Sequence, residues 1–218
     1  MPHRNDQTPL AGDPADAQTL PLVGKEVIVA VCGGIAAYKV CEVVSKLVQA
    51  GAGVTVAMTH AAQQFVTPLT FETLSGRRVH VGLHQVVDAG DTQHIGLTER
   101  ADVMLVAPAT TNVIARVAQG ICDDLVSTMI CAAACPVVFA PSMNSRMWDH
   151  PIAQENYAKL ASLGYTFIGP EEGWLACRNV GAGRLTDPAD IVAELTRMLT
   201  LPGEMPPLVG EVVLEDVE

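Results

Sequence analysis

The sequence predicts an α/β fold in which a parallel sheet lies between two layers of helices. Short apolar runs rich in Val and Ile alternate with longer amphipathic stretches along most of the chain. This alternation is typical of buried parallel strands joined by crossover helices. With 218 residues, of which 49% are hydrophobic, the chain is also long enough to form one domain with a substantial core.

The strands of this sheet are expected at residues 26–31, 54–58, 103–107, 137–140 and 165–168, where all but the last are nearly continuous apolar runs. Helices are expected to begin near Ile35, Ala109, Asp123 and Pro151, and after Asp187, which can cap a helix that has Pro188 at its first position. Residues 70–93 are the least regular segment. The predicted fold class is therefore a three-layer Rossmann-like (flavodoxin-like) parallel sheet with helices on both faces.

The two ends of the chain differ from this pattern. Residues 1–22 lack hydrophobic periodicity and are expected to form a flexible arm, followed by the packed domain at residues 23–200. Residues 201–218 combine three prolines with Glu and Asp, so we expect an acidic tail. No apolar run approaches the roughly 20 residues of a membrane span, and the N-terminus lacks the apolar core of a secretory signal. A cytoplasmic protein is expected.

Charge and cysteine content exclude two further classes. A formal net charge of -11 argues against a nucleic-acid surface, because such surfaces need clustered Lys and Arg. No CxxC pair is present, so we expect no metal site. Five of the six cysteines lie in apolar periodic stretches and are expected to be reduced core thiols: Cys32, Cys41, Cys122, Cys131 and Cys135.

The segment VIVAVCGGIAAYK, residues 27–39, is a strand followed by Gly33, Gly34 and a helix. Backbone N–H groups and the helix dipole favour an anion at such a turn, although a glycine pair can also serve only to allow a tight turn. Two other strands end in polar loops, at Thr59 and at residues 108–112. Parallel strands bring these loops to one edge of the sheet, where α/β proteins bind ligands.

Five motifs, GGIAAYK, HIGLTERAD, PATTN, PSMNSRMW and GWLACRNVGAGRL, occur in this order. Through them the chain resembles the flavin-dependent cysteine decarboxylase (flavoprotein) family from about residue 25 to residue 199. The resemblance implies FMN as the cofactor. PATTN departs from the serine-containing PASAN of many members, but both threonines retain short hydroxyls. The residues implied to hold FMN are Gly33, Gly34, Ile35, Thr59, Phe65, Pro108, Ala109, Thr110, Thr111 and Asn112.

The resemblance also implies an enzyme that converts 4'-phospho-N-pantothenoylcysteine to 4'-phosphopantetheine in coenzyme A biosynthesis. In this chemistry the flavin oxidises the carbon that bears sulfur to a thioaldehyde, carbon dioxide leaves, and the resulting enethiol is reduced again. The implied catalytic residues are His94, which handles the thiol proton, and Cys177, which protonates the enethiolate carbon. Asn144 and Met143 are implied to bind the substrate, and the Asn144 amide can hold its carboxylate.

Three alternatives share this scaffold: a decarboxylase of peptide C-terminal cysteines, a prenyltransferase that modifies FMN, and a non-enzymatic FMN-binding regulatory subunit. The HIGLT, PxMN and LAC motifs disfavour the prenyltransferase. Cys177 disfavours the other two, because peptide enzymes stop at the enethiol and the regulatory relatives typically lack this cysteine.

The resemblance further implies a small-molecule substrate and a homotrimer or a dodecamer of trimers. Because the chain ends soon after its last expected helix, any synthetase for the preceding step is expected to be a separate protein. Gly173, Gly181 and Gly183 are interpreted as hinges of a flap over the substrate. Arg178 stands where members often have glycine, and its role stays open.

Overall fold

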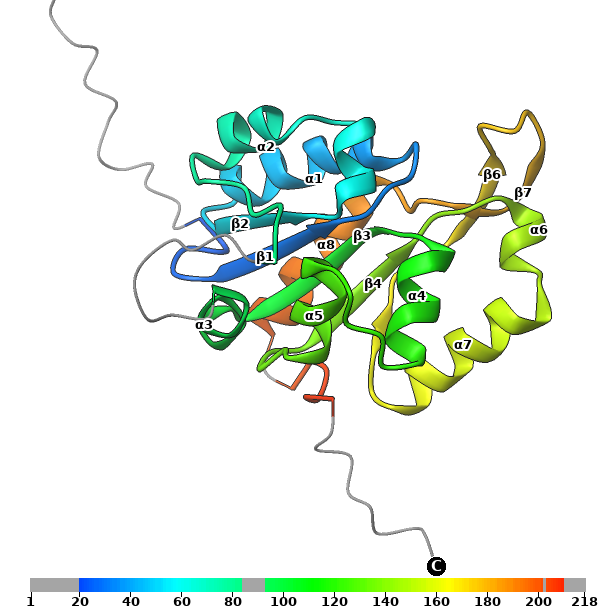
Figure 1. Cartoon of the computed structure of the whole chain (residues 1–218). Coiled ribbons are helices and arrows are strands. Elements are labelled where there is room, and N and C mark those ends of the chain that lie inside the picture. Colours follow the sequence, from blue (N-terminus) through cyan, green and yellow to red (C-terminus); the bar gives the residue numbers. More distant parts are fainter. Residues whose placement is uncertain (1–19, 84–92, 202, 210–218) are drawn as a thin grey trace, which may run out of the picture.

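A five-stranded parallel sheet forms the centre of the molecule, which we describe from a computed structural model covering residues 20–83, 93–201 and 203–209. The strand order is β2-β1-β3-β4-β5, and every neighbouring pair is parallel. This sheet confirms the predicted fold class (Figure 1). Its strands are β1 (Glu26–Val31), β2 (Gly53–Met58), β3 (Val103–Ala109), β4 (Val137–Pro141) and β5 (Thr166–Phe167).

Helices cover both faces of the sheet (Figure 1). One face packs against α1 (Ala37–Gln49), α2 (Pro68–Ser75) and α8 (Pro188–Thr200). The opposite face packs against α3 (Gln93–Arg100), α4 (Thr111–Ala118), α5 (Leu125–Cys131) and α7 (Pro151–Ser162). Two short elements, the 3-10 helix η2 (His60–Gln64) and α6 (Ser145–Trp148), follow the carboxyl ends of β2 and β4.

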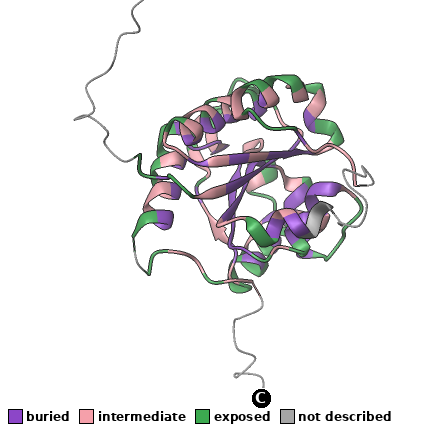
Figure 2. Ribbon diagram, turned by 90° about the vertical axis from the view of Figure 1, so that its left-hand side faces the viewer, coloured by how far each residue is buried: buried purple, intermediate pink, exposed green. Residues whose placement is uncertain are grey.

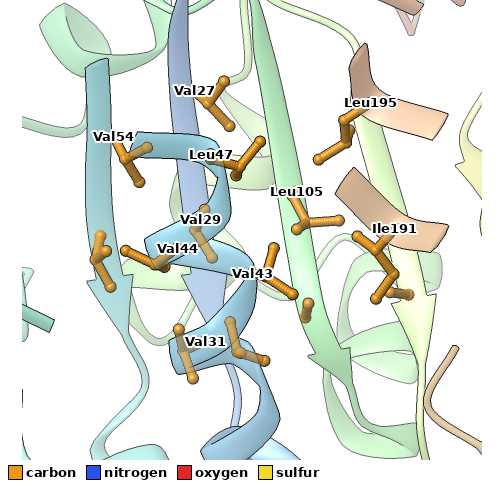
Figure 3. Packing of buried hydrophobic residues seen from close by; sticks show 14 of the residues in the cluster. Val27, Val29, Val31, Val43, Val44, Leu47, Val54, Leu105, Ile191 and Leu195 are labelled. Atoms are coloured by element: carbon orange, nitrogen blue, oxygen red, sulfur yellow. The ribbon is translucent and has the colours of Figure 1, made fainter. Parts of the chain in front are cut away.

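The continuous apolar sequence of β1 follows from burial on both faces. Successive side chains of a strand point to opposite faces. Val27, Val29 and Val31 accordingly enter the core under α1, whereas Ile28 and Ala30 enter the core on the other side. Figure 3 shows Val43, Val44 and Leu47 of α1 lying across these strands. Buried residues concentrate in the sheet and on the inward sides of the helices (Figure 2).

Two regions differ from the sequence prediction. Helix α2 extends into the segment expected to be irregular, residues 70–93. It has Pro68 in its first turn, and Gly76, a left-handed residue with φ 67°, is its C-cap. Part of that segment, residues 84–92, lies outside the described residues. The predicted flap is a second sheet of two antiparallel strands, β6 (Glu171–Trp174) and β7 (Val180–Arg184). The three glycines predicted as hinges all lie within these strands.

The packed domain extends slightly beyond its predicted boundaries. Leu22, assigned to the N-terminal arm, is fully buried in the core. Met205 and Val209, assigned to the tail, also pack against the two core clusters. The rest of the predicted arm and tail, residues 1–19 and 210–218, lies outside the described residues.

The cysteines are all free thiols. Cys32 and Cys135 are buried as expected, but the expectation of a core position is wrong for Cys122 and Cys131, which are exposed. Cys131 is the last residue of α5, and Cys122 lies in the connection before this helix, three residues ahead of Leu125. Within the described residues, no helix is long and apolar enough to cross a membrane.

Candidate active site

A pocket of about 760 Å³ opens at the carboxyl edge of the sheet. Its walls come from the turns after β1 and β2, the start of α4, the segment after β4 and the connection between β6 and β7. The connections from β1 and β3 leave the sheet toward opposite faces, and this switch point is where open α/β sheets bind ligands. The predicted site residues that line the pocket are Gly33, Gly34, Ile35, Thr59, Thr110, Thr111, Asn112, Met143, Asn144 and Cys177.

The glycine turn after β1 combines close packing with unsatisfied donors. A Cβ on Gly33 would overlap the Cβ of Ala61 and come within 2.8 Å of the Ala61 carbonyl carbon. Helix α1 has no side-chain cap and no acidic residue in its first turn. Among the described residues, no backbone hydrogen bond uses the N–H groups of Ile35 and Ala36. An anion at this turn would accept these donors and meet the positive end of the helix dipole.

Two threonine hydroxyls cap the elements that follow β2 and β3. The Thr59 hydroxyl oxygen accepts from the Ala62 N–H at 3.2 Å, and the Thr110 hydroxyl oxygen accepts from the Val113 N–H at 3.4 Å. A hydroxyl that accepts still has its own proton to donate. Both residues line the pocket, so each can cap its helix and donate to a ligand.

Asn144 is the N-cap of α6 and lines the pocket. Its Oδ1 accepts from the Arg146 N–H at 2.9 Å, which leaves the two N–H donors of the amide for a ligand. The neighbouring Met143 is held from two sides. Its N–H donates to the Gly183 carbonyl at 2.9 Å, and its Sδ accepts from the Thr111 hydroxyl at 3.0 Å. Asn144 is thus positioned by its own cap and by a neighbour fixed to β7.

Gly183 is explained by close approach. Its φ is 117°, and a Cβ there would overlap the carbonyl oxygen of Met143. Glycine therefore allows β7 to pack directly on the segment that carries Asn144. Close packing therefore explains the presence of glycine at position 183, and a hinge is not needed to explain it.

Cys177 lies at the tip of the loop that joins β6 and β7. The Arg178 N–H donates to the Leu175 carbonyl at 2.9 Å, and the Leu175 N–H donates to the Asn179 carbonyl at 2.8 Å. With Arg178 at φ 64°, this is a three-residue hairpin loop that ends in a left-handed residue. Arg178 therefore occupies a position that favours glycine, and Cys177 is held at the mouth of the pocket.

The two cysteines that line the pocket differ in their capacity for proton transfer. Cys32 is fully buried, and this burial raises the pKa of its thiol far above the ordinary value. Cys177 is exposed and faces the pocket. A thiol in an accessible position can exchange its proton with a ligand or solvent, so Cys177 is the better candidate for chemistry.

Three of the predicted site residues that the structure describes do not line the pocket with the others. Phe65 is exposed on the surface outside it. Pro108 and Ala109 are buried at the end of β3, and Pro108 supports the glycine turn, since its Cγ lies 3.7 Å from the position of a Cβ on Gly34. His94 belongs to the first turn of α3, but its side chain lies outside the described part of the molecule.

The sequence prediction missed the charged residues of the pocket. Arg116 Nη1 lies 3.1 Å from Asp123 Oδ1 and 2.5 Å from Asp124 Oδ2. Asp124 also caps α5 through a reciprocal pair with Ser127, and the D-x-x-S spacing is a local signal that could have identified it. His60 also lines the pocket, beside Thr59. The described residues contain no cluster of three or more His, Cys, Asp or Glu side chains suited to a metal ion.

Comparisons with known proteins identify relatives of this chain. The chain is 48% identical over 171 residues to the coenzyme A biosynthesis bifunctional protein CoaBC of Bacillus subtilis, an alignment that covers 78% of this chain and 42% of that relative. It therefore spans less than half the length of this relative.

Two solved structures share the fold over most of both chains. A mutant of PPC decarboxylase complexed with pantothenoylaminoethenethiol matches with a TM-score of 0.70 and 28% identity, covering 78% of this chain and 96% of that one. The FMN-dependent cysteine decarboxylase SpaF matches with a TM-score of 0.72 and 29% identity, covering 82% and 99%. The model of the flavoprotein family matches residues 17–200. The chain therefore belongs to the flavoprotein family.

Proposed function

We propose that this chain binds FMN and decarboxylates 4'-phospho-N-pantothenoylcysteine to 4'-phosphopantetheine, a step of coenzyme A biosynthesis. The observation that carries the proposal is the convergence of the glycine turn, Asn144 and Cys177 on one pocket. The similarity to CoaBC and to PPC decarboxylase supports the substrate, and the similarity to SpaF supports the cofactor.

The pocket fits FMN in size and in the chemistry of its walls. Ligand pockets usually have volumes of roughly 300–1,000 Å³, and this pocket measures about 760 Å³. The glycine turn offers free N–H donors to a phosphate, because the N–H groups of Ile35 and Ala36 have no backbone partner among the described residues and α1 has no side-chain cap. Thr59, Thr110, Thr111 and Asn112 supply neutral polar groups for the rest of the molecule.

FMN, when bound, would supply a reversible hydride acceptor, which allows a carboxylate to leave from a cysteine derivative. Asn144 would hold that carboxylate through its amide N–H groups. A neutral donor stabilises the charged ground state less than a cation would, so loss of carbon dioxide is impeded less. His94, from the first turn of α3, would take the thiol proton.

Cys177 would donate the final proton to the substrate carbon as the hydride returns. The hairpin loop holds its thiol at the pocket mouth, where it can be protonated again from solvent. Because hydride removal and hydride return cancel, the overall reaction is redox neutral. Cys177 is therefore needed for the second half of the reaction and not for loss of carbon dioxide.

We also propose a homo-oligomer, with a trimer or a dodecamer of trimers as the expected forms. Several large apolar side chains are exposed on neighbouring elements beside the pocket: Ile35, Tyr38, Phe65 and Leu69. Exposed apolar groups of this kind often mark protein interfaces.

We also propose that the protein is located in the cytoplasm. Its six cysteines are unpaired, which is consistent with a reducing compartment.

The proposal is tested with the purified full chain. It should carry a flavin absorption spectrum, release FMN on denaturation, and form carbon dioxide and 4'-phosphopantetheine in equal amounts from 4'-phospho-N-pantothenoylcysteine. A peptide with a C-terminal cysteine should react much more slowly. A protein that binds no flavin and shows no turnover would refute the proposal, and faster reaction with the peptide would reassign the substrate.

A further inference from the structure

The pocket has little positive charge for a ligand that carries a phosphate. Arg116 is the only Arg or Lys among the described residues that line the pocket. It is already paired with both Asp123 and Asp124, so these three side chains together carry a net charge of about -1. A phosphate monoester, with a charge of about -2 near neutral pH, therefore gains no free cation from this cluster.

Among the described residues that line the pocket, His60 is the remaining one that can carry a positive charge. It is the first residue of η2 and is exposed. Within the described part of the chain, its imidazole makes no hydrogen bond or ion pair with another side chain or with the backbone. Histidine side chains can gain a proton near neutral pH, and a protonated imidazole donates from both ring nitrogens.

The position of His60 relative to the glycine turn is set by the residue that follows it. Ala61 packs directly on Gly33, where a Cβ would overlap the Ala61 side chain. The first turn of η2 therefore stands against the same turn whose N–H groups are free. His60 and the glycine turn form two adjacent walls of one pocket.

We propose that His60 is the cationic contact for the phosphate of FMN and makes the pocket select FMN over riboflavin. The inference rests on the FMN binding proposed above and adds a residue that discriminates between the two flavins. FMN and riboflavin differ only in the phosphate group. A charge-assisted hydrogen bond to that group therefore changes the affinity for FMN and leaves the affinity for riboflavin unaltered.

The test uses the full chain after removal of bound flavin, titrated with FMN and separately with riboflavin by flavin fluorescence. His60→Ala should weaken FMN binding about 10-fold and leave riboflavin binding unchanged. His60→Lys, which restores a cation, should recover most of the FMN affinity. Gln64→Ala, an exposed change in the same short helix that lies outside the pocket, should bind both flavins like the wild type.

Three outcomes would overturn the inference. If His60→Ala leaves the affinities for both FMN and riboflavin unchanged, His60 does not contact the phosphate. If both affinities fall equally, His60 supports the shape of the pocket instead. If the wild-type chain binds neither flavin, the proposed function itself fails, and this result is distinct from the first two.

Discussion

Polar groups have partners at the amino edge of the sheet, whereas several polar groups at its carboxyl edge have none in the described part of the chain. At the amino ends, charged side chains pair with one another. Arg77 binds both carboxylate oxygens of Glu26, with Nη2 at 2.9 Å from Oε1, and Lys25 Nζ lies 3.3 Å from Asp102 Oδ1. Asp102 also accepts from the Glu26 N–H at 2.8 Å. These groups satisfy each other and tie the first residues of neighbouring strands together.

At the carboxyl edge of the sheet, the turns after β1, β2 and β4 carry groups without such partners. The glycine turn leaves N–H groups free, Asn144 keeps its amide donors, and His60 has no side-chain partner among the described residues. The pocket there measures about 760 Å³, whereas the pocket at the amino edge, lined by the paired Glu26 and Arg77, measures about 350 Å³. The charges at the amino edge pair with one another, whereas the carboxyl edge has unpaired donors in addition to the Arg116 ion pairs, and these unpaired donors mark the ligand site.

The largest expected effect separates the two halves of the reaction at the carboxyl edge. Cys177→Ser should lower formation of 4'-phosphopantetheine about 100-fold or more, because removing a general acid typically costs at least that factor. In a single turnover, the release of carbon dioxide should stay close to the wild-type amount. Mass spectrometry of the products should then detect the decarboxylated enethiol.

The matched control is Cys131→Ser, an exposed cysteine at the end of α5 that does not line the pocket. Both products should form at the wild-type rate in this variant. Normal formation of 4'-phosphopantetheine by Cys177→Ser would remove the cysteine from the mechanism.

The next effect concerns the backbone contact that positions Asn144. Gly183→Ala should lower the free energy of unfolding by about 2–4 kcal/mol. Alanine is strained at φ 117°, and its Cβ would also overlap the Met143 carbonyl oxygen. Gly120→Ala is the control, since its φ is 69° and a Cβ there meets nothing within 4 Å. It should cost about 1 kcal/mol. Equal losses in urea unfolding experiments would show that β7 does not pack tightly on this segment.

The smallest effect lies at the amino edge. Arg77→Ala should lower the free energy of unfolding by less than about 1 kcal/mol, since both partners of the ion pair are about 40% exposed. Decarboxylation should be unchanged. A loss of turnover with intact folding would show that the amino edge also takes part in function.

The same ion pair predicts the direction of a pH effect. The hydrogen bond from Arg77 lowers the pKa of the Glu26 carboxyl below its ordinary value of 4.5. A carboxyl whose pKa is lower in the folded state stabilises the fold above the unfolded value. The difference in stability between wild type and Arg77→Ala should therefore be full above pH 4.5 and disappear as the pH falls through the lowered pKa. A difference that grows in acid would contradict this assignment.

The sequence predicted the parts of the fold that depend on local pattern. All five strands lie where apolar runs were expected, and α8 begins at Pro188 with Asp187 as its cap. Three helices begin two residues later than expected, because Ala36, Thr110 and Asp124 are their N-caps. The short strands β6 and β7 were missed because glycine and polar residues interrupt their alternation.

Apart from Thr59, the pocket residues that the sequence predicted all belong to one of the five motifs. The motifs identified Asn144, Cys177 and the glycine turn, which the structure brings to one pocket. The pairing of Arg116 with Asp123 and Asp124 depends on how α4 turns into α5, and no residue spacing reveals it. The same limit applies to His60, whose place beside Gly33 depends on the packing of Ala61.

Amide hydrogen exchange with and without FMN tests the difference between the two edges most directly. FMN should slow exchange at residues 33–38 and 110–113, at the carboxyl edge. Exchange at residues 25–27 and 100–103, at the amino edge, should stay unchanged. Binding of FMN that protects the amino edge, or that leaves the glycine turn unprotected, would contradict the placement of the ligand site.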